Sequence, residues 1–412
     1  MSKKKKKRGL LISVLCGLLI PFLEVLIIVG CNSSWLIRKN VLIILICFLA
    51  FTIIMLMYGL KIFFDNFKSS NVRLKKWLKG FYYFCMIVYV LGCSAFMFIM
   101  YGPINYFRNL YITTAMKTMH HKYLAQIFYS DETIQDIMNS NYFIELNENA
   151  DVDSIKINTA EKKEYLDDYE RELLTRDGNN DLYKILDITI GNSNAYLVAI
   201  YDPTKVRLIR TKKFNIGGSG ERVVTMCERY KGAVCINAGG FVDYGMGSDI
   251  PTGYVIENGE IIWSDGDATS SRQNIIGLTF DGKLKLMSNA TGEEALDDGV
   301  MDGIVFGPFL IVNGKPLNIV GDPWGKAPRV AIAQRKDGVM MFLVVDGENY
   351  INGASLKEMV DVLLQYGAYN AANLDGGQST SLVVGNSLYN NPPAAAKSQK
   401  GRYVVTGFGL IP

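Results

Sequence analysis

The sequence predicts an α+β fold in which a mixed β-sheet with flanking helices and several hairpins follows three transmembrane helices. Long apolar segments are confined to residues 1–101, and short apolar runs separated by turn pairs begin at Leu182. Two helical stretches in the later part each lead into an apolar run. The 412 residues therefore divide into a membrane anchor (1–101), a juxtamembrane helix and linker (102–181), and a globular domain (182–412).

The anchor is predicted from apolar length and flanking charge. Residues 10–31, 41–60 and 81–101 each approach the roughly 20 apolar residues that a helix needs to cross a bilayer. Lysine and arginine gather before the first segment and between the second and third, and such basic segments stay on the cytoplasmic side. We expect a multi-pass protein of the cell membrane, in contact with lipid, with a cytoplasmic N-terminus and an extracellular C-terminal domain. A cleaved signal peptide in place of the first span leads to the same placement.

Between the anchor and the globular domain, the composition changes twice. Residues 106–129 mix aromatic, apolar and basic side chains at helical spacing, which suits a helix at the membrane surface. Residues 130–181 are polar and acidic, with short helical patterns at 131–139 and 160–175. We expect this second stretch to be a linker.

The globular domain contains four turn pairs between apolar runs, and each predicts a hairpin. These pairs are Asn258-Gly259, Asp281-Gly282, Asn313-Gly314 and Asp337-Gly338. Helices are predicted for residues 221–230 and 355–366, the second opening with a capping box formed by Ser355 and Glu358. Each helix leads into a strand, at 233–237 and 371–375, that ends in a glycine-rich turn. We expect both turns to lie near one edge of the mixed sheet, where ligands often bind.

Cysteine, histidine and net charge limit the chemistry. Only Cys227 and Cys235 lie outside the apolar segments and their ends, and both a disulfide and two unpaired buried thiols are open for this pair. The only histidines, His120 and His121, precede the globular domain, which excludes a histidine-based triad or a thiolate–imidazole metal site there. A net charge of +3, with the lysine clusters assigned to membrane orientation, does not indicate nucleic-acid binding.

The segment Asn373 to Leu382 (NLDGGQSTSL) is the most informative motif. It delivers the carboxylate of Asp375 into Gly376 and Gly377, followed by three hydroxyl side chains. Glycines let backbone N–H groups approach a ligand, and the hydroxyls add short donors. An Asp-Gly turn between two strands explains the same letters without any function, so the motif alone leaves both interpretations open.

Four motifs in order and spacing resemble the phosphodiester glycosidase family. They are Ile236–Phe241 (INAGGF), Gly307–Lys315 (GPFLIVNGK), Pro328–Gly347 (PRVAIAQRKDGVMMFLVVDG) and Asn373–Leu382. The resemblance covers roughly Leu182 to Pro412. It implies a hydrolase that cleaves a sugar-1-phosphodiester at the anomeric carbon, and we expect it to require no cofactor. Together with the predicted anchor, this favours a membrane-anchored enzyme that acts on a bacterial envelope or exopolysaccharide glycan. Its substrate is expected to be a sugar-phosphate glycan or a lipid-linked sugar phosphate, and transfer in place of hydrolysis stays open.

The expected chemistry suggests roles for residues within these motifs. Glycoside cleavage usually needs two carboxyl groups, and we choose Asp375 as the first. Asp346, Glu348 and Asp243 are candidates for the second, of which we prefer Asp346 because it follows a long apolar strand. A phosphate leaving group needs neutralisation, and Arg329 is placed to supply it. The residues expected to bind substrate are Asn237, Gly239, Gly240, Phe241, Asn373, Gly376, Gly377, Gln378, Ser379 and Thr380.

Two departures and two alternatives accompany the resemblance. Gln378 stands where many members have a third glycine, and Ala238 where glycine is common, and both changes can alter which sugar fits. A bound Ca²⁺ or Mg²⁺ ion stays open, with oxygen ligands from Asp243, Asp346, Glu348 and Asp375, although no spacing resembles a dedicated calcium loop. The alternative function is a non-catalytic module that binds phosphoglycans within an envelope-assembly complex.

Overall fold

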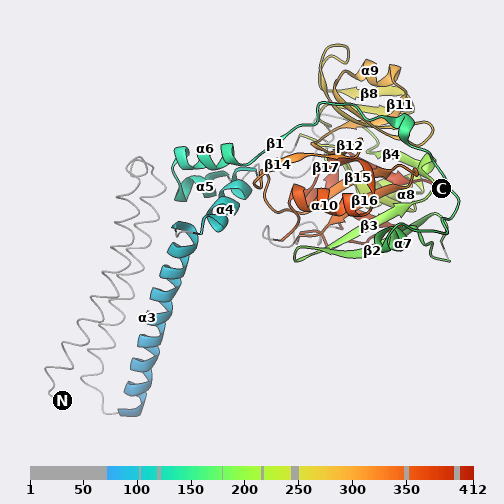
Figure 1. The fold of residues 1–412 in the computed structure, drawn as a ribbon. Coiled ribbons are helices and arrows are strands. Elements are labelled where there is room, and N and C mark those ends of the chain that lie inside the picture. Colours follow the sequence, from blue (N-terminus) through green and yellow to red (C-terminus); the bar gives the residue numbers. More distant parts are fainter. Residues whose placement is uncertain are drawn as a thin grey trace. The chain divides into compact units, whose positions relative to one another are not determined.

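The computed structural model describes residues 72–101, 104–117, 122–178, 180–214, 218–242, 250–347, 352–393 and 400–412. The chain divides into two compact units, Met1–Ser140 and Asn141–Pro412, whose elements are labelled in Figure 1. The first two expected transmembrane segments, 10–31 and 41–60, lie outside the described residues, as do His120 and His121.

The first unit is helical where it is described. Its helices are α3 (Val72–Tyr101), α4 (Asn105–Lys117), α5 (Lys122–Phe128) and α6 (Asp131–Ser140). Ile112, Ala125 and Tyr129 are buried among the last three helices and the end of α3, and the Tyr129 hydroxyl donates to the Met100 carbonyl at 2.8 Å. The third expected span lies in α3, but none of the helices in the described ranges is both long and apolar enough to cross a membrane. The three-span anchor therefore stays a prediction.

The second unit is an α+β domain with three large sheets. The seven-stranded sheet has the order β13-β12-β17-β15-β16-β3-β2, and two five-stranded sheets have the orders β19-β18-β6-β21-β4 and β10-β9-β11-β7-β8. In chain order these strands are β2 (Tyr183–Ile190), β3 (Ser193–Ile200), β4 (Val206–Arg210), β6 (Val234–Asn237), β7 (Tyr254–Glu257), β8 (Glu260–Ser264), β9 (Gln273–Thr279), β10 (Leu284–Ala290), β11 (Val300–Val305), β12 (Phe309–Val312), β13 (Lys315–Pro316), β15 (Arg329–Arg335), β16 (Met340–Val345), β17 (Ala368–Leu374), β18 (Leu382–Val384), β19 (Ser387–Leu388) and β21 (Thr406–Leu410).

Smaller elements complete this unit. Two-stranded ladders join β1 (Tyr142–Ile144) to β14 (Asn318–Val320) and β5 (Glu221–Arg222) to β20 (Tyr403–Val404). The helices are α7 (Asp168–Leu174), α8 (Val223–Tyr230), α9 (Gly292–Asp297) and α10 (Leu356–Gln365), with short 3-10 helices η1 (Val152–Ser154), η2 (Pro203–Lys205) and η3 (Gly377–Ser379). In Figure 1 the sheet with β8 and β11 lies above the seven-stranded sheet, and α9 covers its outer side.

All ladders between the described strands are antiparallel, so the expected mixed sheet is wrong. The two helix–strand pairs that suggested parallel neighbours supply β6 and β17, which belong to different sheets. The four predicted hairpins are confirmed as β7–β8, β9–β10, β12–β13 and β15–β16. Their tight turns reverse the chain and therefore produce antiparallel pairs.

Alternation along β15 separates two cores. Val330 and Ile332 enter a cluster shared by all three large sheets, which also contains Ile236 and Ile276. Ala331 and its alternate neighbours enter a second cluster, which α7 and α10 cover from the other side. Because successive side chains of a strand point to opposite faces, the seven-stranded sheet is buried on both of its faces.

A disulfide joins Cys227 of α8 to Cys235 of β6, and both residues are fully buried. This outcome decides between the two alternatives that the sequence left open. The bond links α8 to the strand that ends at Asn237.

Residues 141–178, expected to lie in a linker, instead pack along the second unit. β1 pairs with β14, and Ile155 is 1% exposed. The N–H groups of Lys156 and Asn158 donate to the carbonyls of Lys336 and Asp337 at 2.8 and 3.0 Å. Helical structure in the 160–175 stretch is limited to α7. The strap, defined here as residues 141–178, is therefore part of the fold of the domain.

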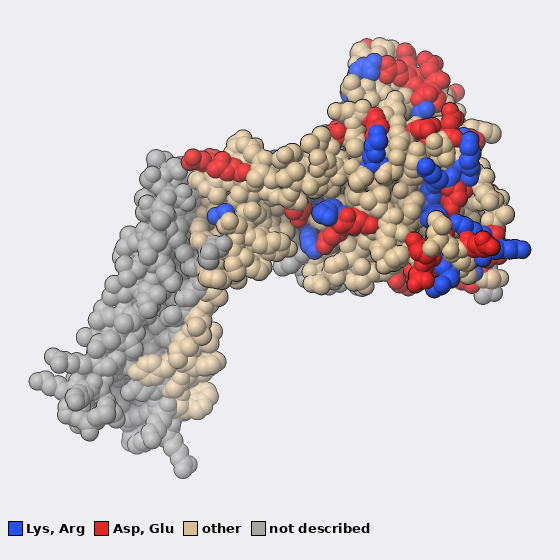
Figure 2. Space-filling model, viewed as in Figure 1, with Lys and Arg blue, Asp and Glu red and all other residues tan. Residues whose placement is uncertain are grey.

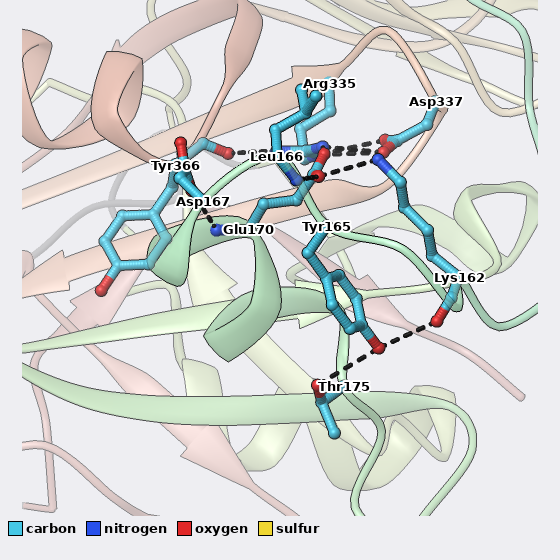
Figure 3. Close-up of polar contacts among 9 residues, drawn as sticks. All are labelled: Lys162, Tyr165, Leu166, Asp167, Glu170, Thr175, Arg335, Asp337 and Tyr366. Carbon is cyan, nitrogen blue, oxygen red and sulfur yellow. Dashed lines mark hydrogen bonds and ion pairs between the residues drawn. The ribbon is translucent and has the colours of Figure 1, made fainter.

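A buried ion network pins the strap to the end of β15 (Figure 3). Arg335 donates from Nη2 to Glu170 Oε1 at 2.6 Å and from Nε to both oxygens of Asp337 at 3.1 Å. The side chains of Arg335 and Glu170 are 9% and 6% exposed. Burial by itself would raise the pKa of Glu170, but hydrogen bonds from Lys162, the Leu166 N–H and Arg335 bring it below its usual range. Glu170 is thus held as an anion.

We predict that Arg335→Met lowers the free energy of unfolding by about 3 kcal/mol, because it removes the buried cation that the buried Glu170 and the half-buried Asp337 share. Chemical denaturation of the full-length chain measures this loss. Arg171→Met is the matched control on α7, because the ion pair of Arg171 with Asp168 is exposed and should contribute nothing measurable. Equal stabilities of the two variants would show that the network does not hold the strap.

Candidate active site

The ends of β6 and β17 come together, although the strands belong to different sheets. The N–H of Asp375, directly after β17, donates to the Ala238 carbonyl at 2.8 Å. The Asn237 side chain, at the end of β6, donates from Nδ2 to the Asp375 carbonyl at 2.6 Å. The two glycine-rich turns therefore converge as expected, but between two sheets and not at the edge of one.

Asn237 also holds the far end of the same turn. Its Oδ1 accepts from the Ser381 N–H at 2.9 Å, and the residue is 1% exposed. One buried side chain therefore bridges the first and last residues of the segment 375–381, which we call the carboxylate turn. These two hydrogen bonds of Asn237 shape the carboxylate turn, and its expected contact with a sugar stays a prediction.

Glycines in both turns permit close approach of neighbouring chain segments. The Gly377 N–H donates to the Pro328 carbonyl at 2.8 Å, and a Cβ on Gly376 would lie 2.6 Å from that oxygen. A Cβ on Gly239 would lie 2.8 Å from Thr406 Oγ1, which accepts from the Gly239 N–H at 3.0 Å. A Cβ on Gly240 would lie 2.7 Å from Thr252 Oγ1. Close packing therefore favours glycine at 239, 240 and 376, independently of any ligand.

The hydroxyl side chains of the carboxylate turn are buried. Ser379, Thr380 and Ser381 are 1%, 0% and 1% exposed, and Ser381 Oγ donates to the Ser379 carbonyl at 3.0 Å. Within the described part of the chain, Thr380 Oγ1 and Asn373 Oδ1 are buried without a hydrogen-bond partner. A buried oxygen without a hydrogen bond lowers the stability of the folded state by about 1–3 kcal/mol. In native structures it usually binds an ordered water or a ligand.

The remaining predicted contacts flank these groups. Asn373 donates from Nδ2 to the Gly307 carbonyl at 3.1 Å. Gln378 lies half-buried in η3. Phe241 is half-buried after the first turn, with the Arg402 guanidinium 5.2 Å from its ring centroid.

Arg329 is buried at the start of β15 next to the carboxylate turn. Val330 pairs with Leu374, so Arg329 and Asp375 are the next residues across this antiparallel ladder. The guanidinium donates from Nε to the Ala354 carbonyl at 3.1 Å and from Nη2 to the Gly325 carbonyl at 2.8 Å. Burial lowers the pKa of Arg329 to about 10, although the charge of Asp322 opposes this shift. The side chain remains a cation at neutral pH in a largely desolvated position.

Asp346 follows β16 and is 5% exposed. Its carboxylate accepts from the Tyr196 hydroxyl at 3.1 Å, from Asn390 Nδ2 at 2.9 Å, and from the Asn391 N–H at 2.9 and 3.0 Å. Burial and then the charge of Asp346 raise the pKa of Tyr196. A role for Asp346 as the second catalytic carboxyl group stays a prediction. Sequence reasoning missed Asn390 and Asn391, because no motif marks them before Pro392.

The other predicted acidic residues, Asp243 and Glu348, lie outside the described residues. Among the residues that the structure does describe, no group of three or more histidine, cysteine, aspartate or glutamate side chains is placed to hold a metal ion. On the face drawn in Figure 2, basic and acidic side chains are interspersed over the second unit, and acidic ones gather around α9.

Comparisons with known proteins locate the relationship in the second unit. Residues 230–411 match the family model described as phosphodiester glycosidase. The chain is 30% identical over 181 residues to the SPbeta prophage-derived uncharacterized protein YomE of Bacillus subtilis, covering 42% of this chain and 27% of that protein. It is 27% identical over 205 residues to human N-acetylglucosamine-1-phosphodiester alpha-N-acetylglucosaminidase, covering 43% of this chain and 37% of the enzyme.

Among solved structures, the chain is similar to the catalytic domain of the zebrafish N-acetylglucosamine-1-phosphodiester alpha-N-acetylglucosaminidase, solved as a form auto-inhibited by its pro-peptide. It aligns with a TM-score of 0.45 and 21% identity over 56% of this chain and 82% of that one. The family match includes β6, β15, β17 and the carboxylate turn. Residues 230–411 of this chain thus form a domain of the phosphodiester glycosidase family, distantly related to the animal enzymes, as the sequence motifs predicted.

Proposed function

We propose that this chain is an enzyme that cleaves a sugar-1-phosphodiester at the anomeric carbon, with Asp375 as its catalytic carboxylate. The observation that carries the proposal is the fixed position of Asp375. The Asp375 N–H donates to the Ala238 carbonyl, and the Asp375 carbonyl accepts from the Asn237 side chain. These two hydrogen bonds fix the backbone conformation of Asp375. A carboxylate held in this way, half-buried and across the ladder from a buried arginine, suits a reaction that separates a sugar from a phosphate.

The chemistry assigns a separate task to each charge. In the proposed step, the bond from the anomeric carbon to the bridging oxygen breaks, and its electron pair leaves with the phosphate. The oxygen of water forms the new bond to the same carbon, while Asp375 accepts the proton or first acts as the nucleophile. Arg329 offsets the charge that develops on the leaving phosphate, and a desolvated cation does this better than one in water.

Two buried oxygens support a polar ligand next to Asp375. Asn373 Oδ1 lies two residues before it, and Thr380 Oγ1 lies five residues after it, both without a partner among the described residues. Acceptors of this kind match sugar hydroxyls, which supply donors. A sugar-phosphate glycan of the cell envelope or a lipid-linked sugar phosphate is the substrate class we infer.

Asp375→Asn should remove turnover almost completely, because the amide can neither accept the proton nor attack the sugar. We expect kcat to fall by about 10³-fold or more. The assay incubates the full-length chain with aryl sugar-1-phosphodiesters that differ in their sugar and measures the released reducing sugar. Asp361→Asn on the exposed side of α10 is the matched control and should keep full activity.

An unaffected Asp375→Asn variant would contradict the proposed mechanism. Wild-type protein that binds these diesters and turns over none of them would favour the alternative, a phosphoglycan-binding module.

Arg329→Lys should weaken transition-state stabilisation while keeping the positive charge. Lysine cannot reproduce the guanidinium fork that reaches the Ala354 and Gly325 carbonyls. We expect kcat/KM to fall by about 10²-fold, and inhibition by inorganic phosphate to weaken in parallel. Because Arg329 is buried, thermal unfolding must first show that the variant folds. A folded Arg329→Lys variant with unchanged kcat/KM and phosphate inhibition would remove Arg329 from the mechanism.

We further infer that the domain lies outside the cytoplasmic membrane, anchored by the N-terminal apolar segments. The support is the distribution of lysine and arginine around these segments, together with the Cys227–Cys235 disulfide, because disulfides persist in oxidising compartments.

A membrane-impermeant protease added to spheroplasts tests this placement. We expect it to degrade the second unit while a cytoplasmic marker protein stays intact. Degradation that requires lysis would place the domain on the cytoplasmic side.

A further inference from the structure

The sequence favours Asp346 as the second carboxyl group of a glycosidase, but the surroundings of its side chain indicate a different task. A general acid must carry a proton and release it to the leaving group. The Asp346 carboxylate instead faces donors on both of its oxygens: Asn390 Nδ2 and the Asn391 N–H on Oδ1, and the Tyr196 hydroxyl and the same N–H on Oδ2. Hydrogen bonds of this kind favour the ionised carboxylate.

The Asn390 side chain connects Asp346 to the carboxylate turn by hydrogen bonds. It is 6% exposed, and its Oδ1 accepts from the Leu382 N–H at 2.8 Å. Its Nδ2, already bound to Asp346 at 2.9 Å, also donates to the Thr380 carbonyl at 3.4 Å. Only one orientation of the Asn390 amide satisfies both sides, because the carboxylate requires a donor and the Leu382 N–H requires an acceptor.

Two asparagines from different parts of the domain hold the end of the carboxylate turn. Asn237 accepts from the Ser381 N–H, while Asn390 contacts the residues on either side of Ser381. Asn237 extends from β6, whereas Asn390 is anchored through Asp346 to β16 and β3 of the seven-stranded sheet. The turn begins after β17 of the seven-stranded sheet, and Asp346 with Asn390 ties the far end of the turn back to the same sheet.

We propose that Asp346 is a positioning residue that acts through Asn390 to hold the carboxylate turn, and that it transfers no proton to the substrate. The expected effect of Asp346 on kcat rests on the proposed function. The expected effect of Asp346 on the position of the carboxylate turn rests on the geometry alone. The unit formed by Asp346 and Asn390 is called the brace below.

A double-mutant cycle on the full-length chain tests the kinetic part. Asp346→Asn places an amide N–H₂ against the donors of the brace, and Asn390→Ala removes the connecting side chain. We expect each to lower kcat about 10²-fold, because a small displacement of a catalytic group has an effect of that size. The double variant should lie within about threefold of the lower single variant, since both changes break one connection.

The pH profile separates positioning from acid catalysis. If Asp346 positions the turn, both single variants keep the alkaline limb of the wild-type kcat/KM profile at the same pH. Loss of that limb in Asp346→Asn alone, or a double variant whose loss equals the product of the single losses, would overturn the proposal. Asn370→Ala is the matched control: it removes a fully buried asparagine from the distant part of β17 and should leave kcat unchanged.

Hydrogen exchange tests the structural part without any need for turnover. Amide exchange in a peptide covering residues 380–391 should be faster in both single variants, while a peptide from β9 exchanges as in the wild type. Unchanged exchange at 380–391 would overturn the brace even if the enzyme is active. If the wild-type protein cleaves no diester but exchange at 380–391 is still faster in the variants, the structural role of the brace is supported and the proposed function is contradicted.

Discussion

The bonds between Asn237 and the carboxylate turn are the interaction on which the candidate site depends. They join the end of a strand in one sheet to a turn that begins in another, at the Asp375 carbonyl and the Ser381 N–H. Neither sheet alone determines the position of Asp375, because the turn leaves β17 of the seven-stranded sheet and enters β18 of a five-stranded sheet. A polar side chain that is 1% exposed is tolerated there because both of its polar ends are hydrogen-bonded.

The apolar core explains how the two sheets come close enough for this contact. Val330 and Leu374 beside the site share one cluster with Ile236 and Phe408 of the other sheet. The hydrophobic contacts are not directional, whereas the asparagine bonds are, so packing sets the distance and hydrogen bonds set the orientation. The Cys227–Cys235 bond adds a covalent link behind β6. The site is therefore supported by the interior of the domain and not by a flexible surface.

Local signals could be predicted from the sequence, and long-range ones could not. Asn258 and Gly259 both adopt positive φ in a hairpin turn, and the Ser355 capping box forms as expected, because each depends on a few neighbouring residues. The assignment of β6 and β17 to different sheets depends on pairing between distant segments. β6 pairs with β18 and β21, more than a hundred residues further along the chain, whereas β17 pairs with the earlier strands β12 and β15. The same is true of Glu170, which meets Arg335 only after the strap has wrapped the domain.

The candidate site shows the same division. The motif around Asp375 and its convergence with Asn237 were expected from two glycine-rich turns, but the hydrogen-bond partners were not. Asp346 is a candidate because it follows a strand at a turn. Asn390, which donates a hydrogen bond to the Asp346 carboxylate, belongs to no motif that the sequence reveals. Residue type and spacing thus identify candidate chemistry, and only the folded structure shows which polar groups already bind one another.

Hydrolysis in ¹⁸O-labelled water most directly tests whether the bond to the anomeric carbon is the one that breaks. The full-length chain is incubated with a sugar-1-phosphodiester, and the phosphate product is examined by ³¹P NMR, in which bound ¹⁸O shifts the signal. Cleavage at the anomeric carbon predicts a phosphate product without label, because the oxygen of water joins the sugar. Label in the phosphate would show that the phosphorus–oxygen bond breaks and would contradict the proposed reaction at Asp375.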